Sequence, residues 1–456
     1  MESPHELEAA LAGDLLTSDV GMTHLTALAD RFQGRAAGSP DEAAAATYLV
    51  ETLLSLLGTA PVAQPFRYQG WQRGQGHLSV VSPLARALPS VSLPGSPSRE
   101  LEAEMVSVGS GEEEDVRSAE AAVRGRIALC GAESPRVDGR RPSHRRAKYL
   151  RTVEADAVGF LYAGRNPGML AVTGGLAATE TAPIPGFGIA SEVAAYLERL
   201  LALGPVTLRM TTQHGHEVVT SSNVIAEVPG RTEETILVGA HYDGHDSAQA
   251  AIDNGTGAAV LLELARALSR WHGRLRRTVR FCFWAAEEAG LLGSWRYARS
   301  AGAGLRHVGW VLNLDSVANG QPGALRLRVW PDAAYAALQP VLHSGSLPVE
   351  VVPGLTSDSD HFPFAAAGIP VASAGAAASP HGLVGRGWGH TVGDTLDKVS
   401  APALALAAAT AARIVVRLSE QAPIPPRLRG EALRAALEAA DCLKASRRWE
   451  EFRFLQ

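Results

Sequence analysis

Three apolar runs in the middle of the chain each end in side chains that can bind a metal ion or move a proton. The runs are residues 235–240, 278–286 and 309–314, and the side chains that follow them are His241 with Asp243, Glu287 with Glu288, and Asp315. Imidazole nitrogen and carboxylate oxygen are ligands for zinc and, less specifically, for manganese or cobalt. A carboxylate that binds no metal can serve as a general acid or base. These residue types therefore indicate hydrolytic chemistry assisted by a metal.

The supply of donors is too large for one tetrahedral ion. It consists of two imidazoles and four carboxylates, from His241, Asp253, Glu287, Glu288, Asp315 and His390. Two ions that share one carboxylate would use this supply and leave one acid to move protons. A bare cluster of acids would also repel itself, and a dication relieves that repulsion.

The apolar runs also predict the fold. Continuous apolar runs of this length are typical of strands in a sheet that is covered on both faces. We therefore expect an α/β fold with a central mixed, mostly parallel sheet flanked by helices. Ligands of such sheets bind outside the carboxyl ends of the strands, so the histidine and the acids should meet at one edge.

Two helices of this fold are indicated by local sequence. Residues 41–58 are rich in helix formers, with Ser39-Pro40 as the start and Gly58 as the stop. Residues 255–268 form a second predicted helix, whose small residues permit close packing behind Asp253.

The order of the candidate residues resembles peptidase family M28, the co-catalytic zinc peptidases. The family pattern is His-x-Asp, then Asp-Asn-x-x-Gly, then Glu-Glu, then Asp after an apolar strand, and finally His-Thr-x-x-Asp. The matching residues are His241-Tyr242-Asp243, Asp253-Asn254-Gly255-Thr256-Gly257, Glu287-Glu288, Asp315 and His390-Thr391-Val392-Gly393-Asp394. Each of these residues taken alone could be a turn, a helix start or a loop residue, but their joint order favours the family.

The resemblance implies a zinc-exopeptidase fold of the phosphorylase/hydrolase-like type and a ligand set for two Zn²⁺ ions per chain. His241 and Asp315 would hold one zinc. Glu288 and His390 would hold the other, and Asp253 would bridge the two. The resemblance also implies a strained or cis Asp253–Asn254 peptide bond that aims the bridging carboxylate.

The resemblance also implies the roles of the residues that do not bind metal. Glu287 would be the general base, and Asp243 would orient the His241 ring. Asp360 and His361 are expected close to the site without binding metal, and His245 and His381 are not expected to be ligands either. Gly389 stands where many members carry a tyrosine that assists the oxyanion, so another donor or a somewhat different reaction is expected.

We predict the domain organisation from the length of the chain and from a change in local sequence pattern. The 456 residues exceed what one hydrophobic core usually supports. Residues 76–219 hold short β-like runs between Gly- and Pro-rich turns, and resemble the small, β-rich protease-associated domain that is often inserted in M28 peptidases. We predict residues 1–75 as the first part of the peptidase domain, 76–219 as the insert, 220–422 as the metal-binding part and 423–456 as a helical extension.

The composition of the chain argues against some classes of binding partner. A net charge of −5 argues against a generally basic surface for nucleic acid. The first residues lack signal-peptide features, and no segment is expected to be long and apolar enough to span a bilayer. Cys130, Cys282 and Cys442 are scattered and odd in number, which argues against a disulfide framework. We expect a cytoplasmic protein with a peptide or aminoacyl substrate and with no nucleic-acid or membrane partner.

An exopeptidase is the leading function, with an aminopeptidase ahead of a dipeptidase, a carboxypeptidase or another amide hydrolase of the family. Two rivals remain. A glutaminyl-cyclase-like acyltransferase would use a related scaffold with one zinc, and a receptor-like scaffold would have lost ligands. The full ligand set favours the peptidase.

Overall fold

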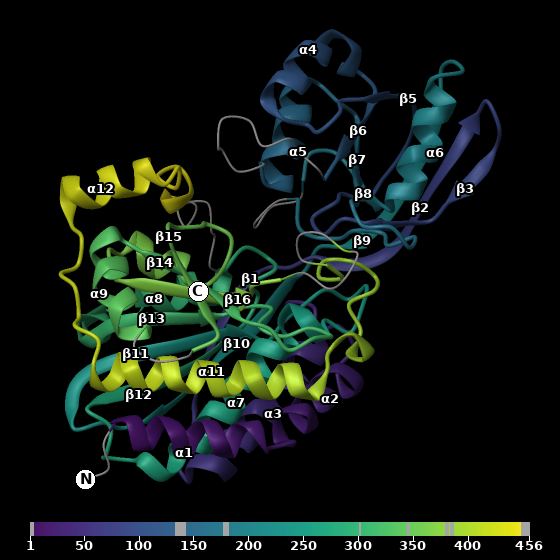
Figure 1. The fold of residues 1–456 in the computed structure, drawn as a ribbon. Helices are drawn as coiled ribbons and strands as arrows, with labels where there is room; N and C mark the ends of the chain where they lie inside the picture. Colours follow the sequence, from purple (N-terminus) through teal and green to yellow (C-terminus); the bar gives the residue numbers. More distant parts are fainter. Residues whose placement is uncertain are drawn as a thin grey trace. The chain divides into compact units, whose positions relative to one another are not determined.

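The computed structural model describes residues 4–132, 143–176, 182–300, 302–343, 347–378, 383 and 387–447 (Figure 1). The chain divides into two compact units. Unit 1 comprises Met1–Arg67, Thr220–Pro380 and Asp394–Gln456, and unit 2 comprises Tyr68–Val219 and His381–Gly393. The domain boundaries drawn from the sequence at residues 75/76, 219/220 and 422/423 stay a prediction.

Unit 1 is built on an eight-stranded sheet with the order β1-β10-β12-β11-β13-β16-β14-β15. The strands are β1 (Val62–Gln69), β10 (Val218–Val228), β11 (Thr232–His241), β12 (Arg277–Trp284), β13 (Val308–Leu314), β14 (Leu325–Trp330), β15 (Val349–Pro353) and β16 (Val371–Ala376). Parallel pairs join β11 to β12 and β13, β13 to β16, and β14 to β15. Antiparallel pairs join β10 to β12 and β14 to β16. The mixed, mostly parallel sheet expected from the apolar runs is confirmed.

The three strands that precede the candidate residues are neighbours. β11 lies between β12 and β13 and runs parallel to both. His241 pairs in register with Trp284 of β12, and Gly239 pairs with Asn313 of β13. The carboxyl ends of β11, β12 and β13 therefore lie at one edge of the sheet. We expected the candidate histidine and acids to meet at this edge.

The helices described in unit 1 are α1 (Pro4–Leu16), α2 (Val20–Arg31), α3 (Pro40–Leu57), α7 (Thr256–Leu268), α8 (Leu292–Ser300), α9 (Asp332–His343), α10 (Phe362–Ala366), α11 (Ala401–Glu420) and α12 (Gly430–Ala439). α7 and α11 pack on β11 and β12, and α1 and α2 pack in turn on α7 and α11 (Figure 1). α3 begins where its caps predict, because the Ser39 side chain accepts a hydrogen bond from the Glu42 amide, and it ends at Gly58 with a φ of 68°.

Helix α11 corrects one expectation. Within the part of the chain that the structure describes, it is the one helix long and apolar enough to cross a membrane by length and composition. The expectation that no segment reaches this size and apolar content was wrong in that respect. However, 72% of its most apolar window is buried inside the protein. Its apolar residues are thus accounted for by packing against α7 and the sheet.

Unit 2 contains a second eight-stranded sheet, with the order β3-β2-β9-β5-β6-β7-β8-β4. The elements are β2 (Gln72–Ser82), β3 (Arg86–Leu88), β4 (Ser90–Ser92), β5 (Arg99–Ser107), α4 (Glu113–Val123), β6 (Ile127–Gly131), α5 (Arg145–Glu154), β7 (Gly159–Ala163), β8 (Gly186–Ile189), α6 (Ser191–Leu201) and β9 (Thr207–Gly215). Unit 2 therefore contains both strands and helices, and α6 begins at Ser191, where the sequence predicts an amphipathic helix over residues 191–203. Its identity as a protease-associated domain stays a prediction.

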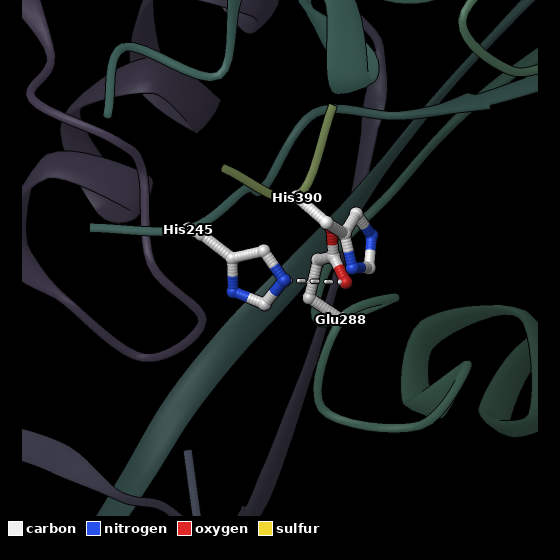
Figure 2. Close-up of side chains that lie close together, drawn as sticks. All are labelled: His245, Glu288 and His390. Atoms are coloured by element: carbon white, nitrogen blue, oxygen red, sulfur yellow. Dashed lines mark ion pairs between the residues drawn. The ribbon is translucent and has the colours of Figure 1, made fainter. Parts of the chain in front are cut away.

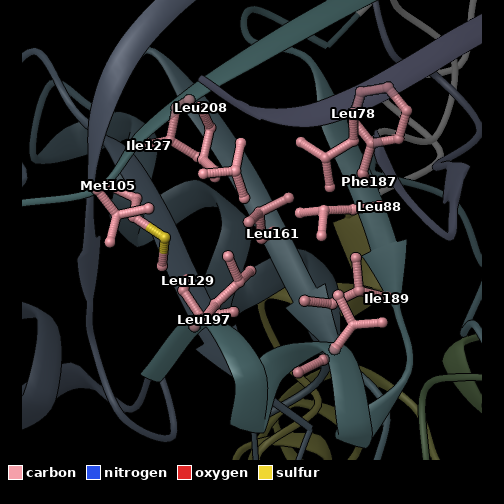
Figure 3. Packing of buried hydrophobic residues seen from close by; sticks show 14 of the residues in the cluster. Leu78, Leu88, Met105, Ile127, Leu129, Leu161, Phe187, Ile189, Leu197 and Leu208 are labelled. Carbon is pink, nitrogen blue, oxygen red and sulfur yellow. The ribbon is translucent and has the colours of Figure 1, made fainter. Parts of the chain in front are cut away.

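Alternating side chains of unit 2 enter two cores. Ile127 and Leu129 of β6 join one core, to which α6 contributes Leu197 (Figure 3). Ala128 of β6 joins the other core, together with Tyr149 of α5. Because successive side chains of a strand point to opposite faces, this sheet is covered on both sides.

Candidate metal centre

His241, the last residue of β11, faces two carboxylates. Its Nε2 atom lies 3.3 Å from Asp253 Oδ1 and 3.8 Å from Asp315 Oδ1. Two ligands of one tetrahedral zinc ion lie about 3.4 Å apart when each bond is about 2.1 Å long. His241, Glu287 and Asp315 also offer ligand atoms within 4.8 Å of one another. Strands β11, β12 and β13 thus bring together donors whose types and spacing fit a divalent ion.

Asp253 sits in a short irregular turn, Ala251–Gly255, and its peptide bond to Asn254 is cis, as the family resemblance implied. The Asn254 side chain donates to the Leu314 carbonyl at 2.8 Å and accepts from the Ser316 amide at 3.1 Å. These two residues flank Asp315. Asn254 therefore ties the backbone of Asp253 to the turn that carries the second carboxylate.

Asp394 holds the same turn from another side. Its carboxylate accepts hydrogen bonds from the amides of Ile252, at 2.7 Å, and of Asp253, at 3.0 Å. Burial raises the pKa of Asp394 to about 6, although the bonds from these amides act in the opposite direction. This acid, which ends the His-Thr-x-x-Asp motif, thus positions the backbone of Asp253.

Asp243 lies beside the His241 ring, but its carboxylate mainly binds the backbone of residues 287 and 288. Its Oδ1 atom is 3.5 Å from His241 Nδ1, and its carbonyl oxygen is 3.2 Å from the same nitrogen. The shorter bonds of its carboxylate come from the amides of Glu287, at 3.0 Å, and Glu288, at 3.1 Å. Asp243 therefore fixes the backbone of the acidic doublet, a role that the sequence analysis did not foresee.

The buried charges at this edge explain why a cation fits. Burial raises the pKa of Glu287 well above its usual value, His241 opposes this, and Glu288, Asp360 and Asp315 raise it further. Burial alone would lower the pKa of His241, but the surrounding carboxylates, led by Glu287, raise it well above its usual value. The acids thus repel one another in the metal-free protein, and a dication would relieve that repulsion.

Asp315 is held by a chain of hydrogen bonds. The Ser359 hydroxyl donates to Asp315 Oδ2 at 2.7 Å, and the Asn313 amide donates to the Ser359 oxygen at 2.8 Å. The next residue, Asp360, accepts from the Ser294 hydroxyl, and burial raises its pKa to about 7. Because the preceding residue, Ser359, contacts Asp315 directly, the expectation that residue 360 lies close to the site is confirmed.

Another histidine of unit 1, His245, lies close to Glu288. His245 Nε2 is 3.0 Å from Glu288 Oε2, and both side chains are buried (Figure 2). We did not expect His245 to bind metal, and the residue belongs to none of the matched motifs. Figure 2 also draws His390. That residue lies in His381–Gly393, which groups with unit 2, so its place in the ligand set stays a prediction.

Comparison with known proteins extends this description. The family model for peptidase family M28 matches residues 223–415. Residues 223–415 belong to peptidase family M28. The M28 segment contains all seven residues to which the sequence analysis gave a role as ligand, base or orienting acid.

Individual relatives of the M28 segment and of the whole chain are aminopeptidases or peptidases by name. A probable leucine aminopeptidase 2 from Trichophyton verrucosum is 36% identical over 167 residues, which are 36% of this chain and 33% of the relative. An aminopeptidase structure from Aneurinibacillus sp. strain AM-1 is 26% identical, with a TM-score of 0.66, and covers 93% of this chain and 98% of that one. The structure of a peptidase M28 precursor from Shewanella amazonensis SB2B is 26% identical, with a TM-score of 0.77, and covers 94% of this chain and 100% of that one. The chain spans 33% to 64% of the length of the first curated relatives that it matches.

Proposed function

We propose that this chain is a zinc-dependent aminopeptidase, which removes the N-terminal residue from a peptide or aminoacyl substrate. The observation that carries the proposal is the position of His241 opposite Asp253 and Asp315, with Glu287 in the same group of potential ligand atoms. Relatives with aminopeptidase names support it, including a solved structure that covers 93% of this chain.

The proposed ligand set holds two ions. His241 and Asp315 would bind the first, Glu288 and His390 the second, and Asp253 both. Bound zinc supplies a Lewis acid for a carbonyl oxygen and for water near neutral pH. The spacing around His241 and the buried, mutually repelling acids fit such ions.

The chain's own residues would carry the proton steps. Water adds to the carbonyl carbon of the scissile amide and gives a proton to Glu287. Glu287 then delivers that proton to the amine nitrogen as the carbon–nitrogen bond breaks. Asp243 supports this role, because its carboxylate fixes the backbone amides of Glu287 and Glu288. Asp394 and Asn254 likewise fix the backbone around Asp253.

The test is the release of free amino acid from a set of aminoacyl amides and dipeptides by the zinc-loaded protein. We expect turnover that a chelator abolishes and zinc restores, and no turnover of the same substrates with an acetylated N-terminus. The proposal fails if the fully metallated protein leaves all free-amine substrates intact. Cyclisation of N-terminal glutamine with one bound zinc would identify the acyltransferase instead, and absence of both metal and turnover would identify a binding scaffold.

The proposal also covers unit 2, the location of the protein and its partners. Unit 2 would be a protease-associated module of this peptidase, which its many strands and the Gly- and Pro-rich turns in residues 76–219 support. The cytoplasmic location and the absence of a nucleic-acid or membrane partner stay predictions from composition.

A further inference from the structure

His245 and Glu288 show the spacing of two side chains that share an ion. The 3.0 Å between His245 Nε2 and Glu288 Oε2 is close to the 3.3 Å between His241 Nε2 and Asp253 Oδ1 (Figure 2). Both separations are near the edge of a zinc coordination tetrahedron, which is about 3.4 Å. His245 is also 8% exposed and Glu288 9% exposed, so the imidazole faces the carboxylate away from bulk water. The separation between His245 and Glu288 is thus similar to the separation between His241 and Asp253.

The backbone on either side of His245 is fixed. A side chain at Gly34, where φ is +68°, would meet the His245 carbonyl oxygen at 2.6 Å, so this glycine packs directly on the histidine's backbone. The amide of Gly244 donates to the Arg35 carbonyl at 3.2 Å, and the Ala248 amide donates to the His245 carbonyl at 3.3 Å. The contacts of Gly34 and Arg35 come from the loop before α3, and the bond between Ala248 and His245 closes residues 244–248 on themselves.

Arg35 forms hydrogen bonds at both ends of the loop that carries His245. Its guanidinium donates to the Tyr242 carbonyl at 2.6 Å, to the Gln249 carbonyl at 3.0 Å and to the Ala250 carbonyl at 2.7 Å. Arg35 is 0% exposed, so these bonds form in the protein interior. The imidazole of His245 is therefore presented to Glu288 by a loop whose ends and middle are held, which is the preorganisation that a metal ligand needs.

We propose that His245 is a direct ligand of the metal ion that binds at Glu288, which gives this ion an additional protein nitrogen. The inference rests on the proposed metal centre and names a ligand that the family motif lacks. An imidazole suits zinc at such a position because neutral Nε2 is one of its preferred donors. Glu288 does not need His245 for its backbone position, because Asp243 already binds its amide.

The experiment compares H245Q with wild type and with H24Q in the full-length protein. His24 is the matched control, because it is also 8% exposed in unit 1 and pairs with the Tyr48 hydroxyl. Glutamine can still donate a hydrogen bond to Glu288 but is a poor zinc ligand. Zinc content and dissociation constants are measured against a competing chelator, and X-ray absorption of the zinc-loaded proteins counts imidazole ligands. Thermal unfolding of the metal-free proteins checks that each variant folds.

We expect H245Q to weaken one zinc site by at least about tenfold and to remove one imidazole per chain from the absorption spectrum, whereas H24Q changes neither. Unchanged imidazole count in H245Q overturns the inference, even when affinity falls, because that result marks an orienting hydrogen bond. If wild type binds no zinc, the proposed function itself fails. If wild type and H245Q bind zinc alike, only the present inference fails.

Discussion

At the scale of single residues, Asp243 shows how backbone amides stabilise a buried carboxylate. The residue is 0% exposed, and its two carboxylate oxygens accept from the amides of Glu287 and Glu288. Hydrogen bonds to a charged acceptor are about twice as strong as those between neutral groups. One carboxylate thereby fixes both the proposed base and a proposed ligand.

Replacing Asp243 with Asn tests this role. The amide would offer an N–H group to one of the two backbone amides, so one donor loses its acceptor. We expect the free energy of unfolding to fall by about 2–3 kcal/mol and kcat to fall at least tenfold. Urea denaturation and steady-state kinetics measure both. Asp397→Asn, at an exposed acid, is the control, and equal behaviour of the two variants would contradict the role.

Replacing Glu287 with Gln tests the proposed base. Glutamine cannot accept the proton from water, so kcat should fall by about 10² to 10⁴-fold. Zinc content should stay at the wild-type value, because Glu287 is not among the proposed ligands. Metal analysis beside kinetics checks this. A variant that keeps a near-wild-type rate would show that another residue is the base.

At the scale of elements, α3 is joined to the turn that carries the acidic doublet. Its Glu42 accepts from the Gly38 amide, the Ser221 hydroxyl and the Ala286 amide. Burial, and then the charge of Asp243, raise the pKa of Glu42 to about 8. A helix outside the M28 segment thus supports the residue just before Glu287.

The raised pKa of Glu42 predicts a pH dependence. An acid whose folded-state pKa exceeds its unfolded value loses its contribution to stability as the pH rises through the folded pKa. Between pH 7 and 9 the metal-free protein should therefore lose about 1 kcal/mol of unfolding free energy through this group. Urea denaturation at pH 7, 8 and 9 measures the loss. It should shrink in Glu42→Gln and persist in Glu51→Gln, which alters an exposed acid of the same helix.

Helix α7 begins against the metal-site turns. A side chain at Gly257 would meet Asn254 Oδ1 at 2.3 Å and the Leu314 carbonyl at 2.5 Å. The expected close packing of small residues behind Asp253 is thereby confirmed. We expect Gly257→Ala to destabilise the protein by about 1–3 kcal/mol through overpacking and to weaken zinc binding. Gly13→Ala, where nothing lies within 4 Å, should be neutral or stabilising, and similar effects of both changes would contradict this packing argument.

At the scale of the whole molecule, metal binding should be coupled to stability. A ligand that binds only the folded state stabilises it by about 2.7 kcal/mol when present at 100 times its dissociation constant. The buried acids near His241 support that coupling, because burial and mutual repulsion favour their protonated forms in the metal-free protein, and a bound cation would favour the charged carboxylates instead. We expect a chelator to lower the thermal midpoint and zinc to restore it, with magnesium as the control. Equal midpoints with and without zinc would contradict the proposed centre.

The amino-acid sequence alone predicts the central sheet and the acids that stand at its carboxyl edge. A buried strand must be apolar along its length, so the acids after residues 240, 286 and 314 stand out against it. Parallel pairing of β11 with its two neighbours then brings these ends together. The two ends of α3 could also be predicted, because the capping hydrogen bonds of Ser39 and Gly58 are made within one turn of the helix.

The groups that support the site from distant parts of the sequence come together only in the folded protein. Arg35 binds the carbonyl of Tyr242 across 207 positions, and Glu42 binds the amide of Ala286 across 244. Local pattern carries no signal for such pairs, since they meet only after the chain has packed. His245 follows no strand and reaches Glu288 only through its loop. Helix α11 has the composition of a membrane span, and its burial against α7 and the sheet was decided by packing.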